Sequence, residues 1–170
     1  DSSGAVVSLD AGVRVRPSGC RSDGCAINYD GSSQLQMDQM VVTFTMLEGL
    51  TWSDGEPLTA DDSVFSFSLA SSDDTPVSKF LFDRTQIYEA ADEVTLQWWG
   101  RPGYIDADYH TNFWMPLPQH KWSEFSPAEL LQVDVSSRAP LGWGPYLVQE
   151  WTPGKSIHLV KNLNYFRSES

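Results

Sequence analysis

The sequence predicts an α+β fold, with a mixed, mostly antiparallel sheet and a few short helices. Residues 40–46 are rich in β-branched and aromatic side chains, which is typical of a strand. Residues 86–90 and 94–99 are two further strand-like runs around a polar turn, a pattern that predicts an antiparallel hairpin. Residues 60–70 follow a helix-capping pattern. Strands that neighbour each other in sequence, with few helices between them, favour the α+β class.

Shorter strands are predicted near both ends of the chain. Residues 13–16 alternate valine with arginine, as a half-buried strand does, and residues 26–29 predict a second strand closed by a glycine-serine turn. Residues 144–151 and 156–161 predict another hairpin. Its turn, Thr152-Pro153-Gly154-Lys155, has proline and glycine in favoured positions.

The segment 60–70 carries two conflicting signals. Thr59 and Asp62 have the spacing of a capping box, and Asp61 adds a second carboxylate that suits the first turn of a helix. The phenylalanines and leucine that follow alternate with serine, which favours a strand. We predict a helix because the cap is the more specific signal. Shorter helices are predicted after Pro118, through Trp122, and from Pro127 onward, with Ser126 as N-cap.

The composition bounds the function. The 170 residues include 23 Asp and Glu against 11 Lys and Arg, a formal net charge of −12. Nucleic acids are bound by clustered cations, and the sequence shows no such cluster, so we expect no nucleic-acid partner. The negative charge also opposes binding to an anionic membrane surface. The same charge favours a soluble, secreted protein. No long apolar run predicts a membrane span and no signal peptide opens the chain, as expected of a mature protein or an excised piece.

The two cysteines, Cys20 and Cys25, have four residues between them. A zinc site would need further ligands at suitable spacing, and a redox pair more often has two intervening residues. Gly24 permits a tight turn between the cysteines. Of these alternatives we favour a small disulfide loop, which would indicate an oxidising compartment.

Three segments carry specific motifs. The first, residues 42–66, contains Trp52-Ser53-Asp54-Gly55 and Pro57-Leu58-Thr59-Ala60-Asp61-Asp62. The second is Met115-Pro116-Leu117-Pro118-Gln119-His120-Lys121-Trp122. The third contains Gly142-Trp143-Gly144-Pro145-Tyr146, then Trp151-Thr152-Pro153-Gly154 and Asn162-Leu163-Asn164-Tyr165-Phe166. In this order the segments resemble bacterial extracellular solute-binding proteins of family 5, the components of ABC importers for peptides, dipeptides or nickel.

The resemblance implies a fragment of the first lobe of a type II periplasmic-binding-protein fold. It places residues 1–138 in the outer subdomain of that lobe and residues 139–170 in the first strands of the core subdomain, with the remainder of the protein absent. The implied function is to bind a solute, preferably a peptide, and to deliver it to an ABC permease in the membrane. The implied location is extracytoplasmic, in the periplasm or as a cell-surface lipoprotein. We expect neither enzymatic activity nor a cofactor.

The hairpin at 144–161 would then lack its partner strands. Unpaired strand edges and uncovered apolar side chains promote association. We therefore expect the hairpin either to pack across the outer subdomain or to pair with a second copy of the chain, with some apolar side chains partly uncovered: Tyr146, Val148, Ile157 and Leu159.

Tryptophans are the candidates for ligand binding. Trp143 lies between two glycines, where a bulky ring can be presented on a tight backbone. Trp98 and Trp99 are adjacent in a predicted strand and should face opposite sides, one buried and the other half-exposed. Of the two, Trp99 is the candidate for ligand binding. Trp114 is as compatible with the core as with a cleft. Trp52 and Phe65 are expected in the core.

Metal binding and catalysis have little support in the sequence. Asp106, Asp108 and His110 alternate and would share one face if extended, as metal ligands can, but an acidic surface loop explains them as well, and we expect no metal. No nucleophile elbow or zinc-protease motif occurs. Two alternatives to solute binding remain: a carbohydrate-binding or adhesion module, suggested by the tryptophans, and a hydrolase that uses a pair of carboxylates.

Overall fold

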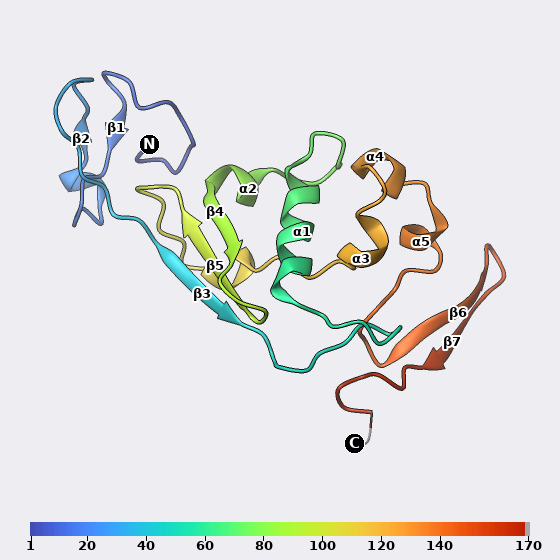
Figure 1. The fold of residues 1–170 in the computed structure, drawn as a ribbon. Helices are drawn as coiled ribbons and strands as arrows, with labels where there is room; N and C mark the ends of the chain where they lie inside the picture. Colours follow the sequence, from blue (N-terminus) through green and yellow to red (C-terminus); the bar gives the residue numbers. More distant parts are fainter. Residues whose placement is uncertain (169–170) are drawn as a thin grey trace.

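The structure, a computed structural model, describes residues 1–168. Its centre is a three-stranded antiparallel sheet with helix α1 (Ala60–Ser71) on one face, as Figure 1 shows. The strands are β3 (Val41–Thr45), β4 (Thr85–Ala90) and β5 (Thr95–Gly100), in the order β3-β5-β4. The predicted α+β class and the hairpin of β4 and β5 are confirmed.

Strand β5 supplies most of the core. Leu96 and Trp98 are fully buried, and they pair across the sheet with Phe44 of β3 and Tyr88 of β4. The indole N–H of Trp98 donates to the hydroxyl of Thr85 at 2.8 Å. Gly100 is required beside this ring, because a Cβ atom there would lie 2.6 Å from it. The central strand is therefore locked by large aromatic rings.

Helix α1 resolves the conflict between the two sequence signals. The residues that it buries are small or polar and recur every three or four positions, as on one helix face: Ala60, Asp62, Ser63, Ser66 and Ala70. Ser63 and Tyr88 share a buried hydrogen bond between their hydroxyls at 2.7 Å. The alternation of serine with phenylalanine does not mark two faces of a strand, because Ser66 is buried, Ser68 is exposed and Phe67 packs against the core. The predicted helix at 60–70 is confirmed.

Short helices lie on both sides of α1. Helices α3 (Gln119–Trp122), α4 (Pro127–Leu130) and α5 (Asp134–Ser137) lie beyond α1, on the side away from the sheet (Figure 1). The first two were predicted, with Ser126 as N-cap of α4. Helix α5 and helix α2 (Phe80–Arg84), which leads into β4, were not. No helix within residues 1–168 is long and apolar enough to cross a lipid bilayer.

The part of the chain that precedes β3 forms a small unit, which lies beyond the N-terminal end of that strand (Figure 1). Strands β1 (Arg14–Val15) and β2 (Ile27–Asn28) pair antiparallel and are shorter than the predicted 13–16 and 26–29. Between them Cys20 and Cys25 form the expected disulfide, with 5.6 Å between their Cα atoms. A short 3-10 helix, Asp23–Cys25, closes this loop, and another spans Tyr109–Asn112.

The last two strands form a hairpin that stands apart from the sheet (Figure 1). Strand β6 (Tyr146–Thr152) pairs with β7 (Ser156–Lys161), and Lys155 N–H closes the predicted turn on the carbonyl of Thr152 at 3.0 Å. Gly154 has a φ of 74°, as this turn requires. Every residue of β7 is exposed. The hairpin therefore does not pack across the outer part of the chain, which was one of the two arrangements expected.

Candidate functional site

The three motif segments meet in space around the loop Trp52–Gly55. Backbone N–H of Ser53 donates to the carbonyl of Gly142 at 2.9 Å, and the side-chain amide of Asn164 donates to the carbonyl of Ser53 at 3.0 Å. The side chain of His120 reaches Asp54 of the same loop. We call this contact region the motif junction: residues 52–55, Asp62, His120, Lys121, Gly142 and Asn164.

Asp62 is the centre of the motif junction. Its carboxylate accepts three hydrogen bonds of 3.0 Å each, from the indole N–H of Trp52 and from the backbone N–H groups of Thr59 and Gln119. The residue is only 5% exposed. It therefore joins the loop before α1, the first turn of α1 and the start of α3. Its expected role as a helix cap is one part of this larger function.

Asp54 makes the second link across the motif junction. Its carboxylate lies 3.0 Å from Nε2 of His120 and 3.5 Å from Nζ of Lys121. Burial alone would raise the pKa of Asp54, but the hydrogen bond from His120 and the backbone N–H of Glu56 outweigh it, so the pKa is lowered. Gly55 follows with a φ of 93°, a backbone conformation that favours glycine. The Asp-Gly pair is thus explained by structure.

The three candidate tryptophans lie in different environments. Trp114 packs its ring against Phe67 at 5.5 Å, and its backbone N–H donates to the hydroxyl of Tyr88, so it belongs to the edge of the core. Trp99 lies on the sheet face opposite the buried Trp98, as predicted, and is half-buried. Trp143 is half-buried beside the motif junction. The structure does not bring the three rings together into one site.

Two expected core residues differ in burial. Trp52 is almost completely buried in the motif junction, with 1% of its surface exposed. Phe65 is only half-buried and lies outside the cluster that packs on the sheet. Its neighbours on α1, Val64 and Phe67, are packed there instead.

The acidic segment at 106–110 forms a turn. The carboxylate of Asp106 accepts from the backbone N–H of Asp108 at 2.9 Å and from the side-chain amide of Asn112 at 2.8 Å. His110 lies in a 3-10 helix, with its ring against that of Tyr109. No group of three or more potential metal ligands gathers anywhere in residues 1–168. These contacts favour the interpretation as an acidic surface loop.

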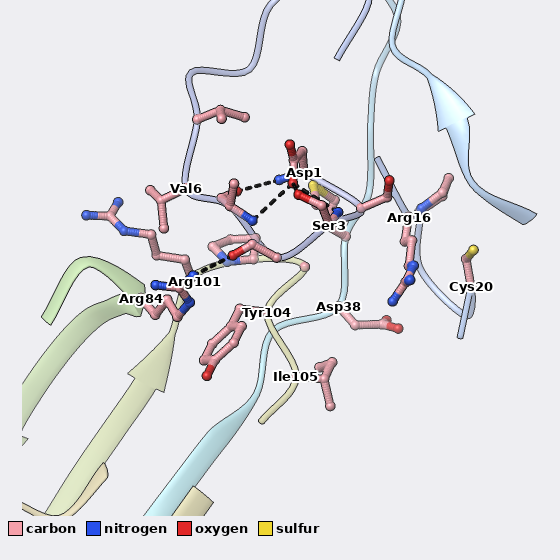
Figure 2. A pocket seen from close by; sticks show the side chains of 18 of the residues that line it. Asp1, Ser3, Val6, Arg16, Cys20, Asp38, Arg84, Arg101, Tyr104 and Ile105 are labelled. Atoms are coloured by element: carbon pink, nitrogen blue, oxygen red, sulfur yellow. Dashed lines mark hydrogen bonds between the residues drawn. The ribbon is translucent and has the colours of Figure 1, made fainter. Parts of the chain in front are cut away.

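A pocket of about 530 Å³ lies between the N-terminal segment and the end of the sheet. Figure 2 shows Val6, Arg84, Arg101 and Tyr104 on one side of it, and Arg16 and Cys20 on the other. Its volume is in the range of small-molecule sites. The tryptophans and motif residues singled out in the sequence do not line it.

Asp38 holds the walls of this pocket together. Its carboxylate accepts from Ser18 at 2.6 Å and from the backbone N–H of Gly19 at 2.9 Å, and it forms an ion pair with Arg21. Its carbonyl accepts from the backbone N–H of Gly103 at 2.7 Å. The pKa of Asp38 is held well below its ordinary value by three hydrogen bonds. In order of decreasing effect, their donors are Ser18, Gly19 and Arg21.

Positive charge gathers in the pocket, although the sequence shows no cluster of cations. Four of the seven arginines line it, together with only two aspartates, Asp1 and Asp38. The arginines are far apart in sequence and converge only through folding: Arg16, Arg21, Arg84 and Arg101. This site could not be predicted from the sequence, because no local pattern indicates that these arginines lie together.

Comparisons with known proteins agree with the resemblance of the motifs. Residues 31–170 match the model of bacterial extracellular solute-binding proteins, family 5, in its middle region. The oligopeptide-binding protein AppA of Bacillus subtilis is 30% identical over 127 residues, which are 70% of this chain and 22% of AppA. A putative ABC transporter peptide-binding protein of Brucella ovis is 30% identical over 137 residues, 79% of this chain and 25% of that protein.

Solved structures show the same fold. The structure of B. subtilis AppA in complex with a nonapeptide superimposes with a TM-score of 0.65 at 26% identity, and the match covers 74% of this chain and 25% of AppA. A putative peptide-binding protein AppA from Clostridium difficile is 22% identical and has a TM-score of 0.63. That match covers 98% of this chain and 34% of the other, so it extends the likeness in fold to residues outside the family model. The chain spans about a quarter of the length of its curated relatives.

Proposed function

Because this chain belongs to the bacterial extracellular solute-binding proteins of family 5, we propose that it forms part of one lobe of the solute-binding component of an ABC importer. The observation that carries the proposal is the match over residues 31–170, with relatives named for peptide binding. A peptide is the proposed solute, since the AppA structure of B. subtilis holds a nonapeptide.

The division of the chain follows from packing. Residues 1–138 hold the sheet and helices that bury their own core, and we propose that they form the outer subdomain. Residues 139–170 hold the β6–β7 hairpin, where Tyr146, Ile157 and Leu159 are 63%, 53% and 57% exposed. Both strands of the hairpin have an open edge within residues 1–168. The hairpin is therefore proposed as the first strands of the core subdomain, to be completed by sequence outside residues 1–170.

The mechanism proposed is closure of two lobes around the solute by a hinge. Such a site takes contacts from both lobes, and this chain supplies at most one wall. Trp143 is the proposed contact in that wall because it is half-buried where the hairpin joins the motif junction. Half of a site cannot desolvate and orient a ligand, so most of the affinity should be absent from residues 1–170 alone.

The proposed partner is an ABC permease, and the proposed location is outside the cytoplasm, in the periplasm or on the cell surface. The disulfide between Cys20 and Cys25 supports an oxidising compartment. The charge of −12 is compatible with a soluble protein that meets its permease without adhering to anionic lipid.

Calorimetry tests the proposal directly. A mixed peptide library is titrated into residues 1–170 and into a longer protein that also contains the second lobe. We expect micromolar or tighter binding only for the longer protein, and a loss of that binding in its Trp143→Ala variant. A dissociation constant of about 1 μM with unit stoichiometry for residues 1–170 would instead place the whole site in this chain.

A further inference from the structure

We propose that the arginine-lined pocket binds a small organic ligand that carries a carboxylate on an apolar body. The pocket lies between residues 1–7, the disulfide loop and residues 101–105. It is separate from the motif junction and from Trp143, so this inference does not depend on the function proposed above. Two observations support it: guanidinium groups that form no ion pair, and exposed apolar side chains.

The four arginines of the pocket differ in how their charge is balanced. Arg16 forms an ion pair with Asp23 at 2.7 Å, and Arg21 forms one with Asp38. Arg84 and Arg101 form no ion pair with any carboxylate of residues 1–168. They contact backbone carbonyls instead, so their charges remain uncompensated.

Arg84 and Arg101 come from adjacent positions at one end of the sheet. Backbone N–H of Arg101 donates to the carbonyl of Arg84 at 2.8 Å, next to the last pair of β4 and β5. Two like charges at neighbouring positions repel each other, and an anion bound beside them relieves this repulsion. The chain as a whole has a net charge of −12, which makes two neighbouring cations without an ion pair more notable.

Arg84 is fixed in place before any ligand arrives. Its guanidinium lies 3.6 Å from the ring centre of Phe80 and 5.7 Å from that of Tyr104, and it donates to the carbonyl of Gly4 at 2.8 Å. Arg101 uses only its Nε–H, toward the carbonyl of Asp83. Its two terminal nitrogens have no protein partner within residues 1–168. This leaves the planar fork that binds carboxylates in bidentate fashion.

The remaining lining is apolar and accessible. Val6, Val7 and Ile105 are each about half exposed, and Met37 and Pro102 complete this part of the pocket. A bare inorganic anion would use only the guanidinium groups. A ligand with a carboxylate on an apolar body would also cover these side chains. The pocket should therefore bind such a ligand more tightly than a bare anion.

Titrations followed by two-dimensional NMR test the proposal on residues 1–170. The probes are benzoate and its neutral analogue benzamide, which has the same ring. We expect benzoate to bind at least about tenfold more tightly, with shifts at the backbone amides of residues 4–7 and 101–105. N-acetyl-phenylalanine, titrated in parallel, carries the carboxylate of a peptide C-terminus, so the tighter of the two acids shows which source of carboxylate the pocket prefers.

Variants separate the pocket from general charge effects. Arg101→Gln should weaken binding of benzoate about tenfold, and Arg101→Lys, which keeps the charge but not the fork, should fall between it and the original. Arg138→Gln is the matched control, because Arg138 is an exposed arginine that directly follows α5 and does not line the pocket. Equal binding of benzoate and benzamide, or equal effects of Arg101→Gln and Arg138→Gln, would overturn the proposal.

Discussion

The sheet with α1 and the hairpin of β6 and β7 are both antiparallel, yet they differ in what they bury. In the sheet, Leu96 and Trp98 are fully buried beneath the helix, and their partners come from the same chain. In the hairpin, β7 is exposed along its whole length, and its apolar side chains face solvent. Regular strands alone therefore do not show that a region buries its own core. The burial of its apolar side chains does.

The two regions are joined by few contacts. The carbonyl of Gly142 and the side chain of Asn164 hold the hairpin to the loop at Ser53. Asn162 is buried and donates from its side chain to the carbonyl of Gly144 at 2.8 Å, which fixes the base of the hairpin. The motifs by which the chain is recognised lie at this joint. They hold the hairpin to the loop before α1, and these contacts explain them structurally.

The largest effect is expected at the centre of the motif junction. Asp62→Ala leaves the buried indole N–H of Trp52 and the partly buried backbone N–H groups of Thr59 and Gln119 without their acceptor. Each such loss costs about 1–3 kcal/mol, so the free energy of unfolding should fall by about 4 kcal/mol. Urea denaturation measures it. Asp61→Ala, one residue away and exposed, is the control and should change stability by no more than about 0.5 kcal/mol.

Substitution of one leucine in each region compares directly how much the two regions contribute to stability. Leu96→Ala removes a fully buried side chain and should destabilise the chain by about 3 kcal/mol. Leu159→Ala in β7, where the side chain is 57% exposed, should change stability by less than about 0.5 kcal/mol. Similar losses for the two variants in thermal denaturation would mean that the hairpin is packed as firmly as the sheet.

The smallest effect is expected from the ion pairs of Asp54. Because the pKa of Asp54 is lowered in the folded state, its contribution to stability is present above its unfolded pKa and is lost as pH falls through the folded value. Denaturation between about pH 6 and pH 2.5 should show an acid-dependent loss of at most about 1 kcal/mol that is missing in Asp54→Asn. An unchanged pH profile in that variant, with Asp61→Asn as control, would contradict this assignment.

Part of this structure could be predicted from sequence because the signals are local. The strand at 40–46, the hairpin of β4 and β5 and the cap of α1 each depend on neighbouring residues. Asp62 was expected only as a cap, because its contacts with Trp52 and Gln119 exist only after folding. Helices α2 and α5, of five and four residues, carry no cap signal strong enough to read.

The pocket was beyond sequence reasoning for a different reason. Its arginines are separated by up to 85 positions, from Arg16 to Arg101, and their neighbours give no sign that they converge. The tryptophans attracted attention because they are large and numerous. Trp52, Trp98 and Trp114 are used in packing, where large rings are most valuable.

Hydrogen exchange of the backbone amides tests most directly the claim that residues 1–138 are self-sufficient and that the hairpin awaits further strands. In residues 1–170, the amides of β5 should exchange only on global unfolding, whereas those of β6 and β7 should exchange at least about 100-fold faster through local opening. In a longer protein that contains the rest of the lobe, the hairpin amides should become as protected as those of β5. Equal protection of both regions in residues 1–170 alone would contradict the account, because the hairpin would then be complete without any further sequence.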